Sequence, residues 1–149
     1  MPIALAFHVL AVVVWVGGMF FAYQILRPAA QPLEPSVRLP LWSRTFTRFF
    51  PWVWAAIIVL LATGYYMAAR QFSGLAHLPP FVNAMQGLGW LMILIYLHLF
   101  FAPYRRLRRA AGAGDFVSAA KALAQIRILV GVNTLLGLLT IFIAVAGAG

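Results

Sequence analysis

The chain contains no cysteine and only two acidic residues, Glu34 and Asp115, among its 149 residues. The lack of thiols excludes disulfides, zinc–thiolate sites and thiol catalysis. Both acids lie between apolar runs, so no carboxylate pair is available for acid–base catalysis, and no Ser/His/Asp set or phosphate-cradling glycine loop can be assembled. Hydrolysis and phosphoryl transfer are therefore disfavoured. Redox chemistry stays open, because a cofactor would supply the reacting group.

Apolar residues are abundant instead. Hydrophobic residues make up 64% of the chain and charged residues 9%, which lies well outside the composition of soluble proteins. The 11 Lys and Arg residues give a formal charge of +9, but they sit between apolar runs. We therefore expect them to meet anionic lipid headgroups, and we expect no nucleic-acid partner because no water-facing domain remains to carry one.

Four apolar runs define the expected fold. They lie at about residues 3–26, 49–69, 84–104 and 128–145. Each is close to the roughly 20 residues that cross hydrocarbon as a helix. The sequence thus predicts an all-α integral membrane protein, a four-transmembrane-helix bundle forming one membrane domain over residues 1–149. The first run has no basic n-region and is too long for a signal peptide, so it is read as a retained span.

The connectors predict the orientation. Most Lys and Arg residues flank or occupy the first and third connectors, whereas the second carries only Arg70. Both termini should therefore be non-cytoplasmic, and the chain is expected in a bacterial inner (plasma) membrane. Residues 28–40 contain four prolines and are predicted to form an extended loop. Asp115 is the expected N-cap of the last helix, which should begin in the cytoplasm.

Two histidines lie at membrane depth, where ionisable groups are costly and so suggest function. Helical periodicity places His8, Trp15 and Met19 on one stripe of the first span, predicted to face the bundle interior. In the third span, Gly87, Leu91, His98 and Arg105 also share a face. The fourth places Arg127, Gly131, Thr134 and Leu138 on a stripe.

These stripes suggest a haem site. A glycine such as Gly87 could let a flat macrocycle lie against the backbone, and Arg105 or Arg127 could meet its propionates. Four-helix bundles hold cofactors with inward side chains, and b-type haem takes His or Met as axial ligands. The structural alternatives to cofactor binding are that the histidines form interhelical hydrogen bonds and that the methionines contribute ordinary packing.

The depths of the two histidines limit that site. His8 and His98 belong to opposite leaflets and differ in depth by about 10 Å at the rise of an α-helix. They are therefore poor candidates to ligate one iron together. Either a single histidine acts with another ligand or two haems are bound, one per leaflet. Met85, Met67 or His77 could partner His8, and Met19 could partner His98.

Several of these residues carry a family resemblance. The segments Ala6–Leu10 and Val14–Phe20 resemble the first helix of the copper-resistance protein D superfamily and of its relative, the J-type membrane protoporphyrinogen oxidase. The likeness extends to Tyr96-Leu97-His98 with the basic run after it, and to Arg127 with Thr134. In the oxidase family the first-helix histidine, matching His8, is associated with b-type haem. The resemblance thus implies a haem-binding redox protein of four helices.

The chain also departs from the oxidase pattern. That pattern has a lysine early in the third helix and an Asn-Glu pair early in the fourth, where this chain has Gly87, and Val130 with Gly131. These departures put porphyrinogen oxidation in doubt and favour the copper-resistance side of the superfamily. Three scattered histidines, without any cysteine, are nevertheless a weak copper signal.

Three functions therefore compete. The first is a haem b protein of the inner membrane that transfers electrons, with a quinone or another small oxidant as partner. The second is a copper transport or copper-resistance component with copper as ligand. The third is a structural subunit whose polar groups only tie helices together, and a porphyrinogen oxidase-like enzyme is a further alternative. The sequence leaves open whether the chain is an enzyme and whether it forms a homo-oligomer.

Overall fold

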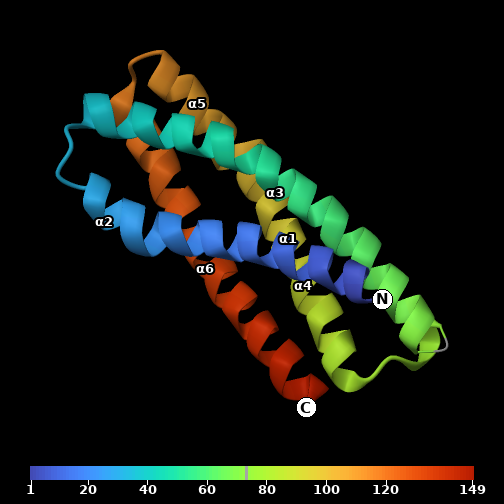
Figure 1. Ribbon diagram of the computed structural model, residues 1–149. Helices are drawn as coiled ribbons and strands as arrows, with labels where there is room; N and C mark the ends of the chain where they lie inside the picture. Colours follow the sequence, from blue (N-terminus) through green and yellow to red (C-terminus); the bar gives the residue numbers. More distant parts are fainter. Residues whose placement is uncertain (73) are drawn as a thin grey trace.

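The computed structural model describes residues 1–72 and 74–149, which form helices joined by short turns (Figure 1). Four continuous helical stretches are long and apolar enough to cross a membrane: Pro2–Ala30, Pro35–Gln71, Pro80–Gly112 and Phe116–Ala148. The predicted all-α membrane fold with four transmembrane helices is confirmed. Each stretch extends beyond the apolar run from which it was predicted.

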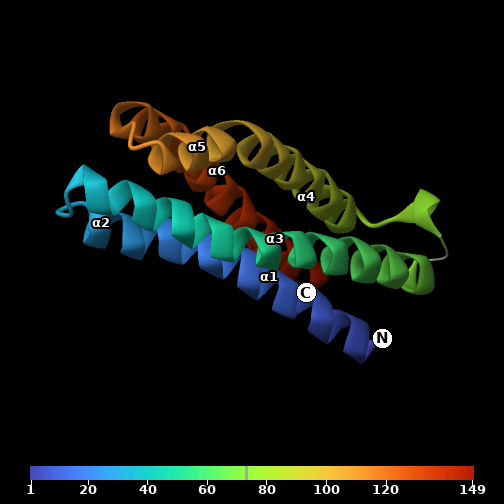
Figure 2. The same cartoon turned by 90° about the horizontal axis from the view of Figure 1, so that it is seen from above.

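The stretches are built from named elements that follow one another along the chain. In order, these are α1 (Pro2–Phe20), the π-helical η1 (Phe21–Leu26), α2 (Arg27–Ala30), α3 (Pro35–Gln71), the 3-10 turn η2 (Leu75–His77), α4 (Pro80–Leu99), the π-helical η3 (Phe100–Tyr104), α5 (Arg105–Gly112) and α6 (Phe116–Ala148). α1 packs mainly on α3, and α4 packs mainly on α6 (Figures 1 and 2). Both termini lie at one end of the bundle, and the α2–α3 and α5–α6 turns lie at the other.

The prediction of an extended loop over residues 28–40 is wrong. α2 continues to Ala30 and α3 begins at Pro35, so only residues 31–34 are not helical. Pro35 lies in the first turn of α3, where no intrahelical N–H is required, whereas Pro28 lies within the continuous stretch Pro2–Ala30 and Pro40 lies inside α3. The helices therefore project past the hydrocarbon at this end, which we call the arginine-rich end because Arg27, Arg38 and residues 105–109 lie there.

The two π-helical segments have a common cause. η1 lies directly before Pro28, and η3 contains Pro103. A proline within a helix removes one N–H donor, and its ring crowds the carbonyl four residues earlier, so a wider turn relieves the clash. Both segments occur where the spans approach the arginine-rich end.

The start of α6 agrees with the prediction. The Asp115 carboxylate accepts a hydrogen bond from the Ser118 backbone N–H at 3.2 Å, which confirms Asp115 as the N-cap. Hydrogen bonding from Ser118, first through its side chain and then through its backbone N–H, lowers the pKa of the Asp115 carboxyl below its usual value. From this cap the helix runs without interruption to Ala148, so the fourth span begins before its apolar run, as expected.

Stacked rings join the two helix pairs. Along α3, the ring of Phe46 stacks on Trp42 at 5.3 Å and on Phe50 at 5.1 Å between centroids. Tyr96 of α4 and Tyr104 of η3 meet Phe50 edge-on at 5.4 Å and 4.7 Å. All five side chains are buried. We call these five residues the aromatic seam.

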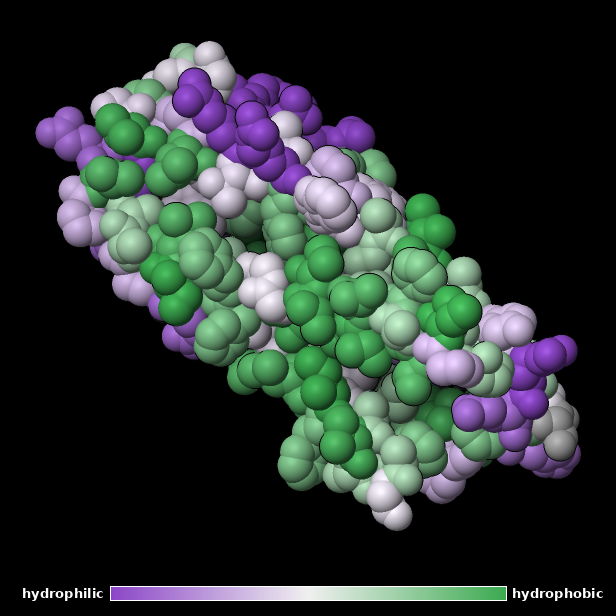
Figure 3. Space-filling model, viewed as in Figure 1, coloured by the Kyte–Doolittle hydropathy of each residue, from purple (hydrophilic) through white to green (hydrophobic). Residues whose placement is uncertain are grey.

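The outer surface is suited to lipid. Phe7, Leu94, Leu135 and Phe142 are each more than half exposed, with values from 55% to 70%. Apolar side chains cover the middle of the face seen in Figure 3, and hydrophilic side chains gather at its two ends. This banding is expected of a protein that spans a bilayer.

A packing variant tests the contact between the helix pairs. A Cβ added at Gly137 of α6 would lie 2.8 Å from Val16 Cγ2 and 3.2 Å from Met92 Cε. We expect Gly137→Ala to lower the free energy of unfolding in detergent by about 1–3 kcal/mol, because the β-branched Val16 cannot easily move away. Gly87→Ala is the matched control, since it has no neighbour within 4 Å and should not destabilise. An unchanged unfolding midpoint for Gly137→Ala, followed by circular dichroism, would contradict this packing.

Candidate functional site

His8 is held between α1 and α3 in the half of the bundle that carries the termini. Its imidazole is half-buried, and Nδ1 lies 2.9 Å from the Thr63 hydroxyl oxygen. The next residue of α3 is Gly64, where an added Cβ would approach His8 Cε1 to 3.2 Å. The absence of a side chain at Gly64 therefore leaves room for the ring beside Thr63.

The hydrogen bonds of Thr63 fix the tautomer of His8. The Thr63 hydroxyl donates its single proton to the Val59 carbonyl oxygen at 2.6 Å. Toward His8 it can then act only as an acceptor, so the proton of the neutral ring lies on Nδ1. The lone pair of Nε2 remains available. Metal-binding histidines in proteins are commonly arranged this way, with one ring nitrogen donating and the other coordinating.

The rest of the predicted first-helix stripe also faces inward. Trp15 is 3% exposed and Met19 is 4% exposed. The Trp15 ring meets Tyr96 of the aromatic seam edge-on at 6.3 Å. The interior orientation is therefore as expected, while binding of a cofactor by these side chains stays a prediction.

The third-helix stripe faces the other way. Gly87, Leu91, His98 and Arg105 are all exposed on the outside of the bundle. α4 buries Met92, Ile93, Tyr96 and Leu99 instead, and the packing of these bulky side chains turns His98 to the opposite side of the helix. Periodicity identified residues that share a face, but it did not show which face is buried. His8 and His98 are thus separated both by depth and by orientation.

The predicted metal ligands lie on two helices, His8 and Met19 on α1 and His98 and Met85 on α4. Within residues 1–72 and 74–149, no three His, Cys, Asp or Glu side chains come together as a site for a metal ion. Met85 is half-buried on α4, and Met19 is buried on α1. Met92, which the sequence analysis did not select, is 3% exposed in the interior. The soft donors inside the bundle are therefore the His8 imidazole and the thioethers of Met19 and Met92.

Asn133 is a buried polar residue that the sequence analysis missed. It is 1% exposed on α6, and its Nδ2 donates to the Met92 carbonyl oxygen at 3.0 Å. Its Oδ1 is buried and has no hydrogen-bond partner in the described part of the chain. An unpaired acceptor inside a membrane protein is costly and suggests a functional reason. The sequence signal that could have identified Asn133 is its polar carboxamide side chain within an apolar run.

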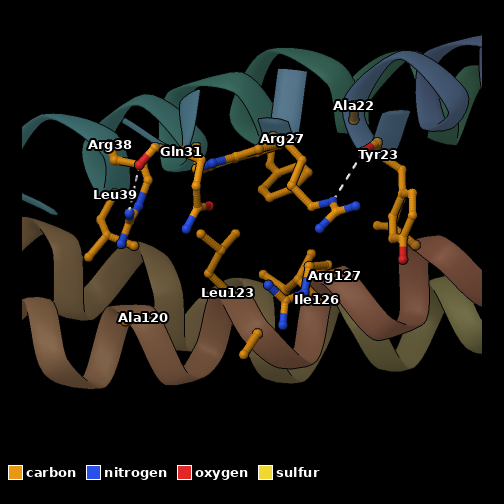
Figure 4. Close-up of a pocket in the computed structure, with 14 residues that line it drawn as sticks. Ala22, Tyr23, Arg27, Gln31, Arg38, Leu39, Ala120, Leu123, Ile126 and Arg127 are labelled. Carbon is orange, nitrogen blue, oxygen red and sulfur yellow. Dashed lines mark hydrogen bonds between the residues drawn. The ribbon is translucent and has the colours of Figure 1, made fainter. Parts of the chain in front are cut away.

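A cavity of about 120 Å³ lies at the arginine-rich end between η1, α2, α3 and α6 (Figure 4). Arg27, Arg38 and Arg127 line it, together with Tyr23 and Gln31. Arg127 was predicted to contact a cofactor. Arg27 and Arg38 were read only as signals of topology, because sequence alone does not show that the three guanidinium groups share one space.

These features define a class: a four-span helical membrane protein with one oriented histidine inside the bundle and an arginine-lined cavity at one end. The family model for copper resistance protein D matches residues 43–146, and the chain belongs to this family. The predicted resemblance is confirmed. The match begins within α3, so α1 and His8 lie outside it. No curated protein and no solved structure matches the chain.

The described residues do not fit the haem site that was predicted on the third span. Gly87, His98 and Arg105 are exposed on the outside of the bundle, whereas Trp15 is buried and meets Tyr96 edge-on. His8 is the histidine among the predicted ligands that faces a neighbouring span. It supplies one candidate axial nitrogen, so the haem hypothesis depends on His8 alone.

A substitution at Asn133 separates a structural role from a functional one. Asn133→Leu removes one hydrogen bond and one unsatisfied acceptor together, so we expect the free energy of unfolding to change by less than about 1 kcal/mol. Asn133→Ala is the comparison, because it leaves a cavity and should destabilise more. Reversible unfolding in detergent measures both variants. A large loss of stability for Asn133→Leu would show that the amide mainly ties α6 to α4.

Proposed function

We propose that the chain is a copper-handling component of a bacterial plasma membrane and that copper is its cargo. The observation that carries the proposal is the His8 ring, whose Nδ1–H is directed to Thr63 and whose Nε2 is left free to coordinate. Membership of the copper resistance protein D family supports copper as the metal. The arginine-rich connectors support a cytoplasmic location for that end, which puts His8 in the outer half.

The interior donors suit a soft metal in transit. Imidazole nitrogen and methionine thioether both ligate Cu(I) without thiolates. A Cβ added at Gly137 would lie close to both Met92 Cε and the Val16 side chain, so Met92 approaches α1 at Val16. Val16 is one helical turn before Met19. His8, Met19 and Met92 thus offer separate donors inside the bundle. Such a row would bind copper weakly at each point, and a transported ion requires sites that it can leave.

Substitution of the two intramembrane histidines tests the proposal. In cells that express the chain, we expect His8→Ala to reduce the change in copper accumulation or tolerance to the level of cells without it. His98→Ala is the matched control because its ring is exposed on the outside of α4, and it should behave like the parent chain. Membrane levels of each variant must be equal. No difference between His8→Ala and the parent would overturn the assignment.

The hydroxyl that orients His8 can be tested separately. Thr63→Val keeps the shape of the side chain but removes the acceptor for Nδ1–H, and loss of such a partner commonly weakens metal binding by about 10–100-fold. We expect a loss of that order in the affinity of purified protein for Cu(I). Thr63→Ser retains the hydroxyl and should restore binding. Equal affinities for the Val and Ser variants would mean that Thr63 does not orient the ring.

A b-type haem is the second candidate, because the same free Nε2 of His8 could act as an axial ligand. Haem would supply one-electron chemistry, with a quinone or another small oxidant as the expected partner. A reduced-minus-oxidised spectrum of protein purified from haem-replete cells separates the candidates. Soret and α bands that disappear in His8→Ala but persist in His98→Ala would replace copper with haem as the ligand of this site.

A further inference from the structure

We propose that the cavity at the arginine-rich end binds the phosphate group of an anionic phospholipid from the adjacent leaflet. This site is separate from His8 and does not depend on the copper proposal. The chemical feature that this site would recognise is a phosphate group attached to an apolar chain. The geometry, the charge and the lining of the cavity each support this ligand.

The cavity brings together cations from different parts of the chain. Arg27 begins α2, Arg38 lies in the first turns of α3, and Arg127 lies on α6. In Figure 4 the guanidinium of Arg27 extends into the space between the helices, with Arg127 opposite it. Residues about 100 positions apart in the sequence thus direct their charged groups toward one small volume.

Arg27 is held in place by two contacts. Its Nε donates to the Tyr23 carbonyl oxygen at 3.2 Å, and its Cζ lies 4.5 Å from the centre of the Tyr23 ring. One Arg38 amino group donates to the Gln31 carbonyl oxygen at 3.4 Å. A guanidinium has five N–H donors, so each of these side chains keeps most of its donors for a ligand. Phosphate oxygens match the planar fork of arginine.

The protein does not neutralise these charges itself. No aspartate or glutamate lines the cavity, and the whole sequence contains only Glu34 and Asp115 as acids. Like charges in a partly enclosed space repel one another more strongly than in water. A bound anion would offset this repulsion, so the cavity is preorganised for a negative group.

The lining favours an amphiphile. Behind the arginines the lining is apolar and includes Leu39, Trp42, Phe46 and Val130, which are buried between the helices. Basic pockets between spans on the cytoplasmic side are typical sites for anionic lipid headgroups. A free phosphate would use the arginines but would have no apolar part to contact this lining.

The size of the cavity distinguishes a headgroup from a macrocycle. Its volume of about 120 Å³ is well above the roughly 10–15 Å³ that one water requires, but it is below the roughly 300–1,000 Å³ of pockets that enclose drug-sized ligands. A phosphate group with the first atoms of its glycerol fits this space, and a porphyrin does not. In this proposal Arg127 contacts the phosphate of the headgroup.

Lipid binding to the whole purified chain tests the proposal. Delipidated protein in an uncharged detergent is titrated with phosphatidylglycerol, and bound lipid is counted by native mass spectrometry while the unfolding midpoint is followed. We expect a saturable rise in the midpoint and retained phosphatidylglycerol. Phosphatidylcholine, whose headgroup carries no net charge, should bind at least about tenfold more weakly.

Charge variants locate the site. We expect Arg27→Gln/Arg127→Gln to weaken phosphatidylglycerol binding by roughly 10–100-fold, the range typical of losing charge-assisted hydrogen bonds. Arg109→Gln is the matched control, because Arg109 is exposed on α5 outside the cavity lining. If the double variant does not fold, Arg127→Gln alone gives the same readout, since Arg127 makes no intramolecular hydrogen bond among the described residues. Equal weakening in Arg109→Gln, or no weakening in the cavity variants, would overturn the site.

A separate arm identifies the source of the phosphate. Inorganic phosphate and glycerol 1-phosphate carry the anion without acyl chains, and we expect neither to raise the unfolding midpoint at concentrations where phosphatidylglycerol saturates. A comparable response to either soluble anion would overturn the lipid assignment. Because these measurements contain no copper, failure at this cavity leaves the test at His8 unaffected.

Discussion

The aromatic seam is the packing on which the rest of this structure depends. Inside lipid, helices gain little from burying apolar surface against one another, so close packing and hydrogen bonds must hold the spans together. The stacked rings of α3 and the tyrosines of α4 and η3 supply that packing, with centroids between 4.7 and 5.4 Å apart. Each aromatic pair contributes about 0.5–1.5 kcal/mol beyond the area that it buries. The seam therefore joins the α1/α3 pair to the α4/α6 pair in the half of the bundle next to the arginine-rich end.

α3 also connects the two candidate sites. Thr63 and Gly64 near its C-terminal end position His8, while Arg38 and Trp42 near its start line the arginine-rich cavity. With 1.5 Å of rise per residue, Thr63 and Trp42 are about 30 Å apart along the helix, which is close to the thickness of the hydrocarbon. The sites thus lie toward opposite surfaces of the membrane, and the seam residues of α3 hold both in register with the remaining spans.

The sequence predicted the features that depend on local or average properties. Run length and hydropathy identified four spans, and the position of Asp115 after Gly114 identified the start of α6. The face of α4 could not be predicted, because it depends on which side chains fill the space beside α3 and α6. His98 was consequently predicted to contact a cofactor, although its ring is exposed on the outside of α4. Thr63 and Asn133 were missed for the same reason: a hydroxyl or an amide in an apolar run becomes informative only when its partner is known.

The distribution of charge separates the two halves of the molecule chemically. In the part of the bundle around His8 and Asn133, the hydrogen bonds join neutral groups, and Asn133 Oδ1 has no partner among the described residues. At the other end, the chain gathers arginines without acids to neutralise them. The first arrangement suits a soft cation that must bind and leave, and the second suits a resident anion. The excess of basic over acidic residues then has a structural meaning: the membrane supplies the counterions that the sequence omits.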